Sequence, residues 1–346
     1  MISDKLAGVS KTDPIIKEEI FDIQYYVGNG GSARQITSPV NLASNGGLVI
    51  VKCISNGYQT VFIDTNRGVR YELHPDSTLP QAYNSDTVTS FLSNGFTVGG
   101  DTGTNYSGFS YSSYAFRKLE GFFDIQTWTG NNSNRTIPHN LGVKPELMII
   151  KCRSDDGVNR QGWAVWARPI KDDVHNYDLD DALLLNSTSA LLSPKRDFFA
   201  HGSVGTEGPQ DTYIHIGQAA ETNASGFSYV GYFFASRQGL SKIGGYVGNG
   251  SSQTIDCGFD AGVRFVMIKR IDSTSDWSYF DTSQWASGKG IVAGNDSRLE
   301  MNTANTSDES ADCIDYNSTG FTVNYVANDN DDINISGADY IYMAIA

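Results

Sequence analysis

The stretch Lys242–Arg270, KIGGYVGNGSSQTIDCGFDAGVRFVMIKR, decides the fold of this chain. It opens with a strand-like segment, Lys242–Val247, and turns at Gly248-Asn249-Gly250. It ends in an apolar run, Val263–Ile268, that is followed by basic residues. Because Asn and Gly accept the positive φ angles of a tight turn, the stretch predicts strands that are joined by a hairpin turn.

This layout is repeated along the chain, at Phe21–Cys53 and at Phe122–Cys152. Each repeat is roughly 100 residues long, which is the size of a single domain and too long for one unit of a solenoid. Further landmarks recur in the same order: Lys52, Lys151 and Lys269; Thr60–Asp64, Trp163–Ala167 and Trp277–Asp281; Leu183–Asn186 and Leu299–Asn302, with Tyr71–His74 more loosely; Asn94–Val98 and Thr319–Val323; and Asn105–Tyr111, Asn223–Tyr229 and Asn334–Tyr340.

The pattern of apolar residues is that of an all-β protein. No window keeps a 3.6-residue apolar period, and short alternating runs such as Phe321–Tyr325 lie between turns rich in Gly, Asn, Ser and Asp. The sequence therefore predicts three tandem antiparallel β-sandwich domains, jelly-roll-like, that arose by internal duplication. The predicted divisions are an N-terminal arm at 1–20 and domains at 21–119, 120–237 and 238–346.

The N-terminal arm lies outside the repeat. Its segment Asp13–Phe21 favours a short helix, because Asp13 suits a cap and Pro14 suits the first helical position, although an extended arm is the open alternative. We expect the arm, with Pro14, Ile15 and Ile16 as candidate docking residues, to anchor the protein to a larger particle through other proteins.

Charge and hydropathy exclude several classes of partner. The net charge of −14 argues against a nucleic-acid partner, because phosphate binding needs clustered Lys and Arg. We expect no signal peptide, since Met1–Lys17 lacks an apolar core. We also expect no membrane insertion, since no apolar run approaches the roughly 20 residues that span a bilayer.

The four cysteines give little information. Cys53 and Cys152 occupy the same place in different repeats, so we expect no disulfide between them. Cys257 and Cys313 lie in one repeat, and the sequence leaves their pairing open. The alternative is four reduced and mostly buried thiols.

No motif for catalysis is present, and we expect no enzyme. The sequence has no metal-ligand spacing of histidines and no nucleophile elbow. The Gly-Asn-Gly turns lead into another strand and not into a helix, so they do not cradle phosphate. His139, in a turn that contains Gly142 and Pro145, is expected to hydrogen-bond the loop backbone rather than act as a base or ligand.

Two acidic clusters are candidates for Ca²⁺, and otherwise we expect no cofactor. Neither cluster matches an EF-hand, so solvated acidic loops are the alternative. A pair of glycosidase carboxylates is a further idea without support from spacing. The clusters contain Asp329, Asp331 and Asp332, and Asp172, Asp173, Asp178, Asp180 and Asp181.

Aromatic residues are the stronger functional lead. Flat aromatic rings beside Asn and Asp suit sugars, whose C–H faces stack while their hydroxyls form hydrogen bonds. Trp128 and Trp285 are the candidate ligand-stacking residues. Trp163 and Trp277 occupy equivalent strand positions and are expected in the core.

As a set, the repeated motifs resemble the tandem β-sandwich modules of tail-fibre and other virion-surface proteins of marine bacteriophages. The resemblance covers about residues 21–346. The first repeat departs most, because Asp76–Asp86 replaces the Leu-rich segment. The motifs are Tyr246–Gly250, Phe265–Arg270, Asp281, Leu183–Thr188, Asn223–Tyr232 and the turn from His139 to Pro145.

The resemblance implies a non-enzymatic structural protein of the virion, assembled in the host cytoplasm. A tail-fibre or spike component that attaches to a host surface glycan is the first expectation. A capsid decoration or head-fibre protein is the alternative, and a glycan-degrading enzyme is a third idea. Because phage fibres are usually symmetric, we expect a homo-oligomer, with a trimer as the guess.

Overall fold

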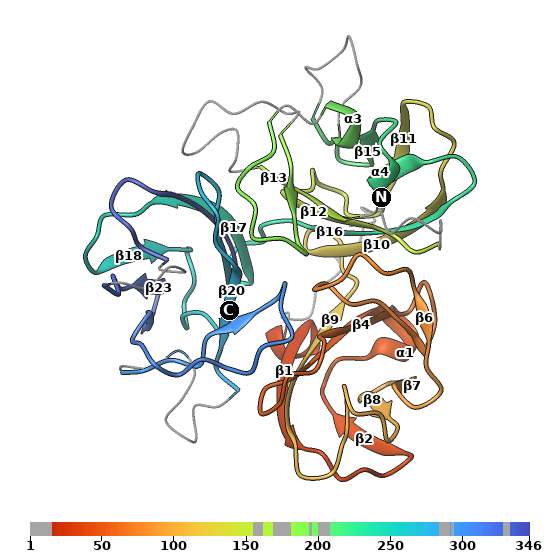
Figure 1. Ribbon diagram of the computed structural model, residues 1–346, viewed down its shortest axis with the longest axis horizontal. Helices are drawn as coiled ribbons and strands as arrows, with labels where there is room; N and C mark the ends of the chain where they lie inside the picture. The colour runs from red at the N-terminus through yellow and green to blue at the C-terminus, as the bar shows by residue number, and fades with distance from the viewer. Residues whose placement is uncertain are drawn as a thin grey trace, which may run out of the picture.

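The computed structural model of the chain describes residues 16–154, 162–168, 181–193, 196–199, 208–283, 291, 294–327 and 333–346. The regular secondary structure of the described part is almost wholly antiparallel strand, so the predicted all-β fold is confirmed. Figure 1 shows three lobes around a common centre, with the first repeat in red to orange, the second in yellow through green to turquoise, and the third in turquoise to blue. We refer to the lobes as units 1, 2 and 3.

Each unit has a main sheet in which the first and last strands of the repeat pair with each other. The second long strand pairs with the other side of the last strand. The main sheets have the orders β1 (Phe21–Val27)-β9 (Ser110–Arg117)-β3 (Gly47–Cys53)-β4 (Val61–Asp64) in unit 1, β10 (Phe123–Thr129)-β16 (Ser228–Phe234)-β12 (Leu147–Cys152)-β13 (Trp163–Ala167)-β14 (Leu183–Leu184) in unit 2, and β17 (Ser241–Val247)-β24 (Asp339–Ile345)-β19 (Phe265–Arg270)-β20 (Trp277–Asp281)-β21 (Leu299–Glu300) in unit 3.

A smaller sheet faces each main sheet. Unit 1 also has a separate hairpin, β5 (Tyr71–Glu72) with β6 (Ala82–Tyr83), where units 2 and 3 add a strand to the main sheet. The smaller sheets are β2 (Arg34–Thr37)-β8 (Gly95–Val98)-β7 (Val88–Leu92), β11 (Arg135–Pro138)-β15 (Tyr213–Ile216), and β18 (Gln253–Asp256)-β23 (Gly320–Val323)-β22 (Ile314–Asn317). The helical pieces are η1 (Lys17–Glu19), α1 (Leu42–Asn45), α3 (Arg196–Phe199) and α4 (Ala220–Asn223).

The Gly-Asn-Gly turns are not hairpins, and that prediction is wrong. Gly28 follows β1, which pairs with β9, and the turn carries the chain to β2, which pairs with β8. The turn therefore crosses from the main sheet to the smaller one. A Cβ atom on Gly28 would lie 2.1 Å from the carbonyl oxygen of Tyr106, so glycine is required by a close approach of two backbone segments.

The central strands of the main sheets are buried on both faces, which explains their continuous apolar sequence. All residues of β3 are buried, as are all residues of β12. Alternate side chains point to opposite faces of a strand. In unit 1, Val49 and Val51 pack inside the sandwich, whereas Leu48 and Ile50 belong to a cluster outside it.

That outer cluster is shared by all three units and fills the centre of the molecule. It surrounds an apolar cavity of about 20 Å³, little more than one water molecule would need. The units therefore bury one common core in addition to the core inside each sandwich. Residues from every unit line the cavity, among them Ile50 and Phe116, Ile149 and Phe234, and Met267 and Met343.

Two predicted boundaries change at the level of residues. The strand expected at Val263–Ile268 begins at Phe265 and ends at Arg270. The predicted arm at 1–20 includes Ile20, which is buried in the shared cluster and accepts a hydrogen bond from the Arg117 amide through its carbonyl oxygen. The body of the protein therefore starts before residue 21, and of the predicted helix the described part keeps the short η1.

Candidate functional site

A buried lysine near the end of β3, β12 and β19 joins each unit to the next. The contacts are Lys52 Nζ to the Thr303 carbonyl oxygen at 2.8 Å, Lys151 Nζ to the Thr78 carbonyl oxygen at 2.8 Å, and Lys269 Nζ to the Thr188 carbonyl oxygen at 3.1 Å. In that order, they run from unit 1 to unit 3, from unit 2 to unit 1 and from unit 3 to unit 2. The three contacts thus form a closed cycle with approximate threefold symmetry.

Trp163 and Trp277 reinforce two of these junctions. Each indole N–H donates to a carbonyl oxygen of the neighbouring unit, Trp163 to His74 at 3.0 Å and Trp277 to Leu184 at 3.0 Å. Both rings are fully buried, as the sequence predicted. Their partners lie across a junction and not within the same sandwich, which the sequence did not indicate.

A buried tyrosine and aspartate form a hydrogen bond at two junctions. The Tyr114 hydroxyl donates to Asp281 Oδ2 at 2.5 Å, and the Tyr232 hydroxyl donates to Asp64 Oδ2 at 2.8 Å. Burial raises the pKa of the Asp281 carboxyl, and burial also raises the pKa of both tyrosine hydroxyls well above the usual value. Perturbed buried groups can mark an active site, but these groups bond across a junction, and we assign them a structural role.

At the third junction, between units 2 and 3, neither the tyrosine nor the aspartate is present. In register, Met343 takes the place of the tyrosine, because it pairs with Met267 as Tyr114 pairs with Ile50. Ala167 takes the place of the aspartate. Met343 and Ala167 line the same apolar cavity of about 10 Å³. Replacing both polar partners by apolar ones avoids leaving a buried group without its hydrogen bond.

In each unit, a buried asparagine late in the repeat binds the glycine turn that follows the first strand. Asn105 accepts from the Asn29 amide at 3.0 Å and donates to the carbonyl oxygens of Gly31 and Gly99. Asn223 and Asn334 do the same in the other units. The repeated Asn-x-Ser-Gly motif is therefore explained by the fold.

Trp128 packs beside this turn, and the prediction that it stacks on a ligand is wrong. The side chain is 8% exposed, and its indole N–H donates to the Thr222 carbonyl oxygen at 3.0 Å. Its ring stacks on Tyr229 with centroids 5.7 Å apart, as Tyr26 stacks on Tyr111 in unit 1. No free face is left for a sugar. Trp285, the other candidate, lies outside the described residues.

The docking arm is described only at its end. Pro14 and Ile15 lie outside the described residues, whereas Ile16 is 51% exposed. Lys17 forms an ion pair with Asp260 of unit 3 at 2.6 Å, although both groups are solvent-accessible and the pair stabilises little. The arm therefore leaves the body where units 1 and 3 meet.

His139 has the structural role that was expected. Its Nδ1 accepts from the Leu141 amide at 3.2 Å, and its Nε2 lies 3.0 Å from the Gln210 carbonyl oxygen. Burial lowers the pKa of the imidazole, which agrees with a neutral ring that accepts at one nitrogen and donates at the other.

The acidic clusters fall mostly outside the described residues, so the expectation for Ca²⁺ stays a prediction. Of the candidate aspartates, Asp181 alone is described, and it is buried. Within the described ranges, no three His, Cys, Asp or Glu residues come together as a metal site would require. All four cysteines are buried and none forms a disulfide, so the alternative of four reduced thiols is confirmed and no bridge joins Cys257 to Cys313.

The sequence reading missed three aromatic side chains at the end of unit 1. Tyr106 is 47% exposed, and its ring centroid lies 4.8 Å from that of Phe109. The Tyr58 ring centroid lies 5.8 Å from that of Phe109, and both of these rings are partly buried against the core of unit 1. Comparison of the repeats could have pointed to Tyr106, because units 2 and 3 have Ala224 and Ile335 at the same position and lack an aromatic ring there.

Comparison with known proteins places the chain in a family without assigning it an activity. In the described part of the chain, no helix is both long and apolar enough to cross a membrane. No curated protein matches the chain, and no solved structure matches it. A family model described as a domain of unknown function, DUF7483, matches residues 17–346, so the chain belongs to the DUF7483 family.

Proposed function

We propose that this chain is a non-enzymatic structural protein of a bacteriophage virion, of the tail-fibre or spike type, that attaches the particle to a glycan on the host surface. The observation that supports it is the closed cycle of three units around one apolar core. A surface protein needs a compact body that keeps its loops in fixed positions. The shared core and the buried lysine contacts supply such a body.

The buried ionisable groups support a structural rather than a catalytic role. Lys52, Lys151 and Lys269 donate to backbone carbonyl oxygens of neighbouring units, and Tyr114 and Tyr232 donate to aspartates of neighbouring units. The central cavity, which Tyr232 lines, is apolar and about 20 Å³ in volume, and this leaves no room for a substrate.

Immunolabelling of intact virions tests the proposal. Antibody raised against the chain is imaged on purified particles by electron microscopy. We expect label on the tail. Label over the head instead contradicts tail attachment and assigns the chain to the capsid, as a decoration or head-fibre protein. Absence of label from particles that carry the gene contradicts a virion role.

The arm is tested by deleting residues 1–16, which keeps the buried Ile20 in place. We expect the shortened protein to fold with an unchanged melting temperature and to be absent from virions. Normal incorporation contradicts a docking role for the arm. The homotrimer also stays a proposal, and light scattering checks it: three chains of 37.7 kDa are expected in one particle, and a mass of one chain contradicts it.

A further inference from the structure

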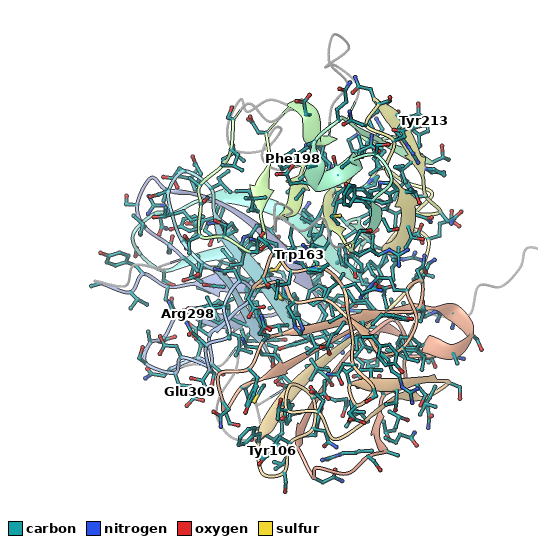
Figure 2. The ribbon with its side chains drawn as sticks, turned by 45° about the vertical axis from the view of Figure 1, so that its right-hand side comes forward. Tyr106, Trp163, Phe198, Tyr213, Arg298 and Glu309 are labelled. Atoms are coloured by element: carbon teal, nitrogen blue, oxygen red, sulfur yellow. The ribbon has the colours of Figure 1, made fainter. Side chains whose placement is uncertain are left out.

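We infer that the end of unit 1 binds a neutral sugar ring on the platform formed by Tyr106, Phe109 and Tyr58. The inference rests on the proposed attachment to a glycan and names the site and the class of ligand. Figure 2 shows Tyr106 at the lower tip of the molecule, away from Trp163 at the centre. A group at the tip is accessible to a large glycan on a surface.

Two turns carry the platform and are fixed to each other. One turn contains Tyr58, and the other contains Tyr106 and Phe109. The Ser110 amide donates to Ser55 Oγ at 2.9 Å, and the Ile54 amide donates to the Ser110 carbonyl oxygen at 2.9 Å. Rings on fixed turns lose little conformational entropy when a ligand binds, which favours affinity.

Tyr106 is not needed by the fold. Asn105 and Tyr111 have equivalents that make the same contacts in units 2 and 3, and the Tyr111 hydroxyl accepts from the amide of residue 106 just as Tyr229 accepts from the Ala224 amide. The backbone at this position is thus the same with a tyrosine or an alanine side chain. An exposed aromatic side chain that the fold does not require indicates a contact with a partner.

A second exposed tyrosine of unit 1 is also replaced by other residues in units 2 and 3. Tyr25 is 44% exposed, and its hydroxyl donates to Ser110 Oγ at 3.0 Å, next to the turn of Tyr106. Its equivalents on β10 and β17 are Thr127 and Gly245. At both positions unit 1 therefore has an exposed tyrosine where units 2 and 3 have other residues.

The polar side chains of the two turns suit a neutral sugar. The exposed side chains of the two turns are Ser55, Asn56 and Ser107, which form hydrogen bonds with hydroxyls and carry no charge. Aromatic rings stack equally well on nucleic-acid bases, but a nucleic acid also needs cations along its backbone. The net charge of −14 opposes that partner, whereas it does not repel a neutral pyranose.

A glycan array followed by titration of variants tests the inference on the full chain. We expect the wild-type protein to bind one or more neutral glycans, and Tyr106→Ala to weaken that binding by about tenfold. Tyr106→Phe keeps the ring and is expected to bind within about threefold of the wild type. Because unit 2 has Ala224 at this position, Tyr106→Ala should leave the melting temperature unchanged.

Tyr83→Ala is the matched control, because Tyr83 is 61% exposed and lies on β6, outside the two turns. It should bind as the wild type does. If Tyr106→Ala binds as tightly as the wild type, the site is wrong while attachment to a glycan stands. If the wild type binds acidic glycans alone, the neutral class is wrong. If it binds no glycan, both the inference and the glycan attachment fail, while virion labelling still tests the structural role.

Discussion

At the scale of residues, the three units show how a buried polar pair is tolerated. Tyr114 and Tyr232 each have an aspartate partner across a junction, and where the tyrosine is replaced by Met343 the aspartate is replaced by Ala167. Losing one partner of a buried pair leaves the other without its hydrogen bond, which costs about 1–3 kcal/mol, whereas losing both is close to neutral.

Tyr114→Phe should therefore destabilise the protein, because the buried Asp281 Oδ2 loses the donor that the tyrosine hydroxyl supplies, while Oδ1 keeps the Ser283 amide. We expect the free energy of unfolding to fall by about 1–3 kcal/mol in urea titrations. The double variant Tyr114→Met with Asp281→Ala copies the third junction and should recover most of that loss. A double variant whose loss equals the sum of the two single losses contradicts the coupling.

The buried lysines predict a dependence of stability on pH. Burial lowers the pKa of Lys52 from 10.5 to about 8. Between these values the unfolded chain keeps a proton that the folded chain has lost, so stability rises with pH across that window. The difference in unfolding free energy between wild type and Lys52→Met should change by on the order of 1–3 kcal/mol from pH 8 to pH 10.

The exposed Lys144 provides the control for that experiment. The change measured for Lys144→Met is subtracted from the change for Lys52→Met, which removes the general effect of losing one positive charge. A constant difference for Lys52→Met would show that its ammonium group keeps its proton across the window, and would contradict the effect of burial on its pKa.

At the scale of elements, the sequence predicted which segments are strands but not how they pair. The strands at Thr60–Asp64 and Trp277–Asp281 were located because apolar runs between turn residues are local signals. The hairpin at Gly28 was wrong because the partner of β1 is β9, more distant in sequence than β2. Pairing depends on contacts between distant segments, and a local turn signal does not determine it.

The glycine turns give a prediction at this scale. Gly28→Ala should destabilise unit 1 by about 1–3 kcal/mol, because a Cβ atom would lie 2.1 Å from the Tyr106 carbonyl oxygen and the two turns would have to separate. Gly57→Ala is the control, since the nearest atom to its Cβ would be at 3.5 Å. Equal melting temperatures for the two variants would mean that the close approach at Gly28 is not present.

At the scale of the whole molecule, the sequence predicted three domains and missed their common core. Periodicity marks Leu48 and Ile50 as apolar but cannot say whether they face a second sheet or another unit. Trp163 and Trp277 were expected in the core for the same reason, and their partners in neighbouring units came only from the structure. Tyr106 was missed because one exposed residue carries no periodic signal.

A common core predicts that the units unfold together. An isolated unit would expose one face of its main sheet, including residues such as Phe116 and Phe265 that touch other units. Residues 17–119 expressed alone should therefore be less stable than in the full chain and prone to association through that face. A monomeric fragment with the melting temperature of the full chain contradicts this.

Differential scanning calorimetry of the full chain tests the central claim most directly, that three repeats close around one core. The account predicts a single transition in which the calorimetric enthalpy equals the van't Hoff enthalpy. Three independent units would instead give separate transitions, or one broad peak whose van't Hoff enthalpy is about a third of the calorimetric value. That result would contradict the shared core.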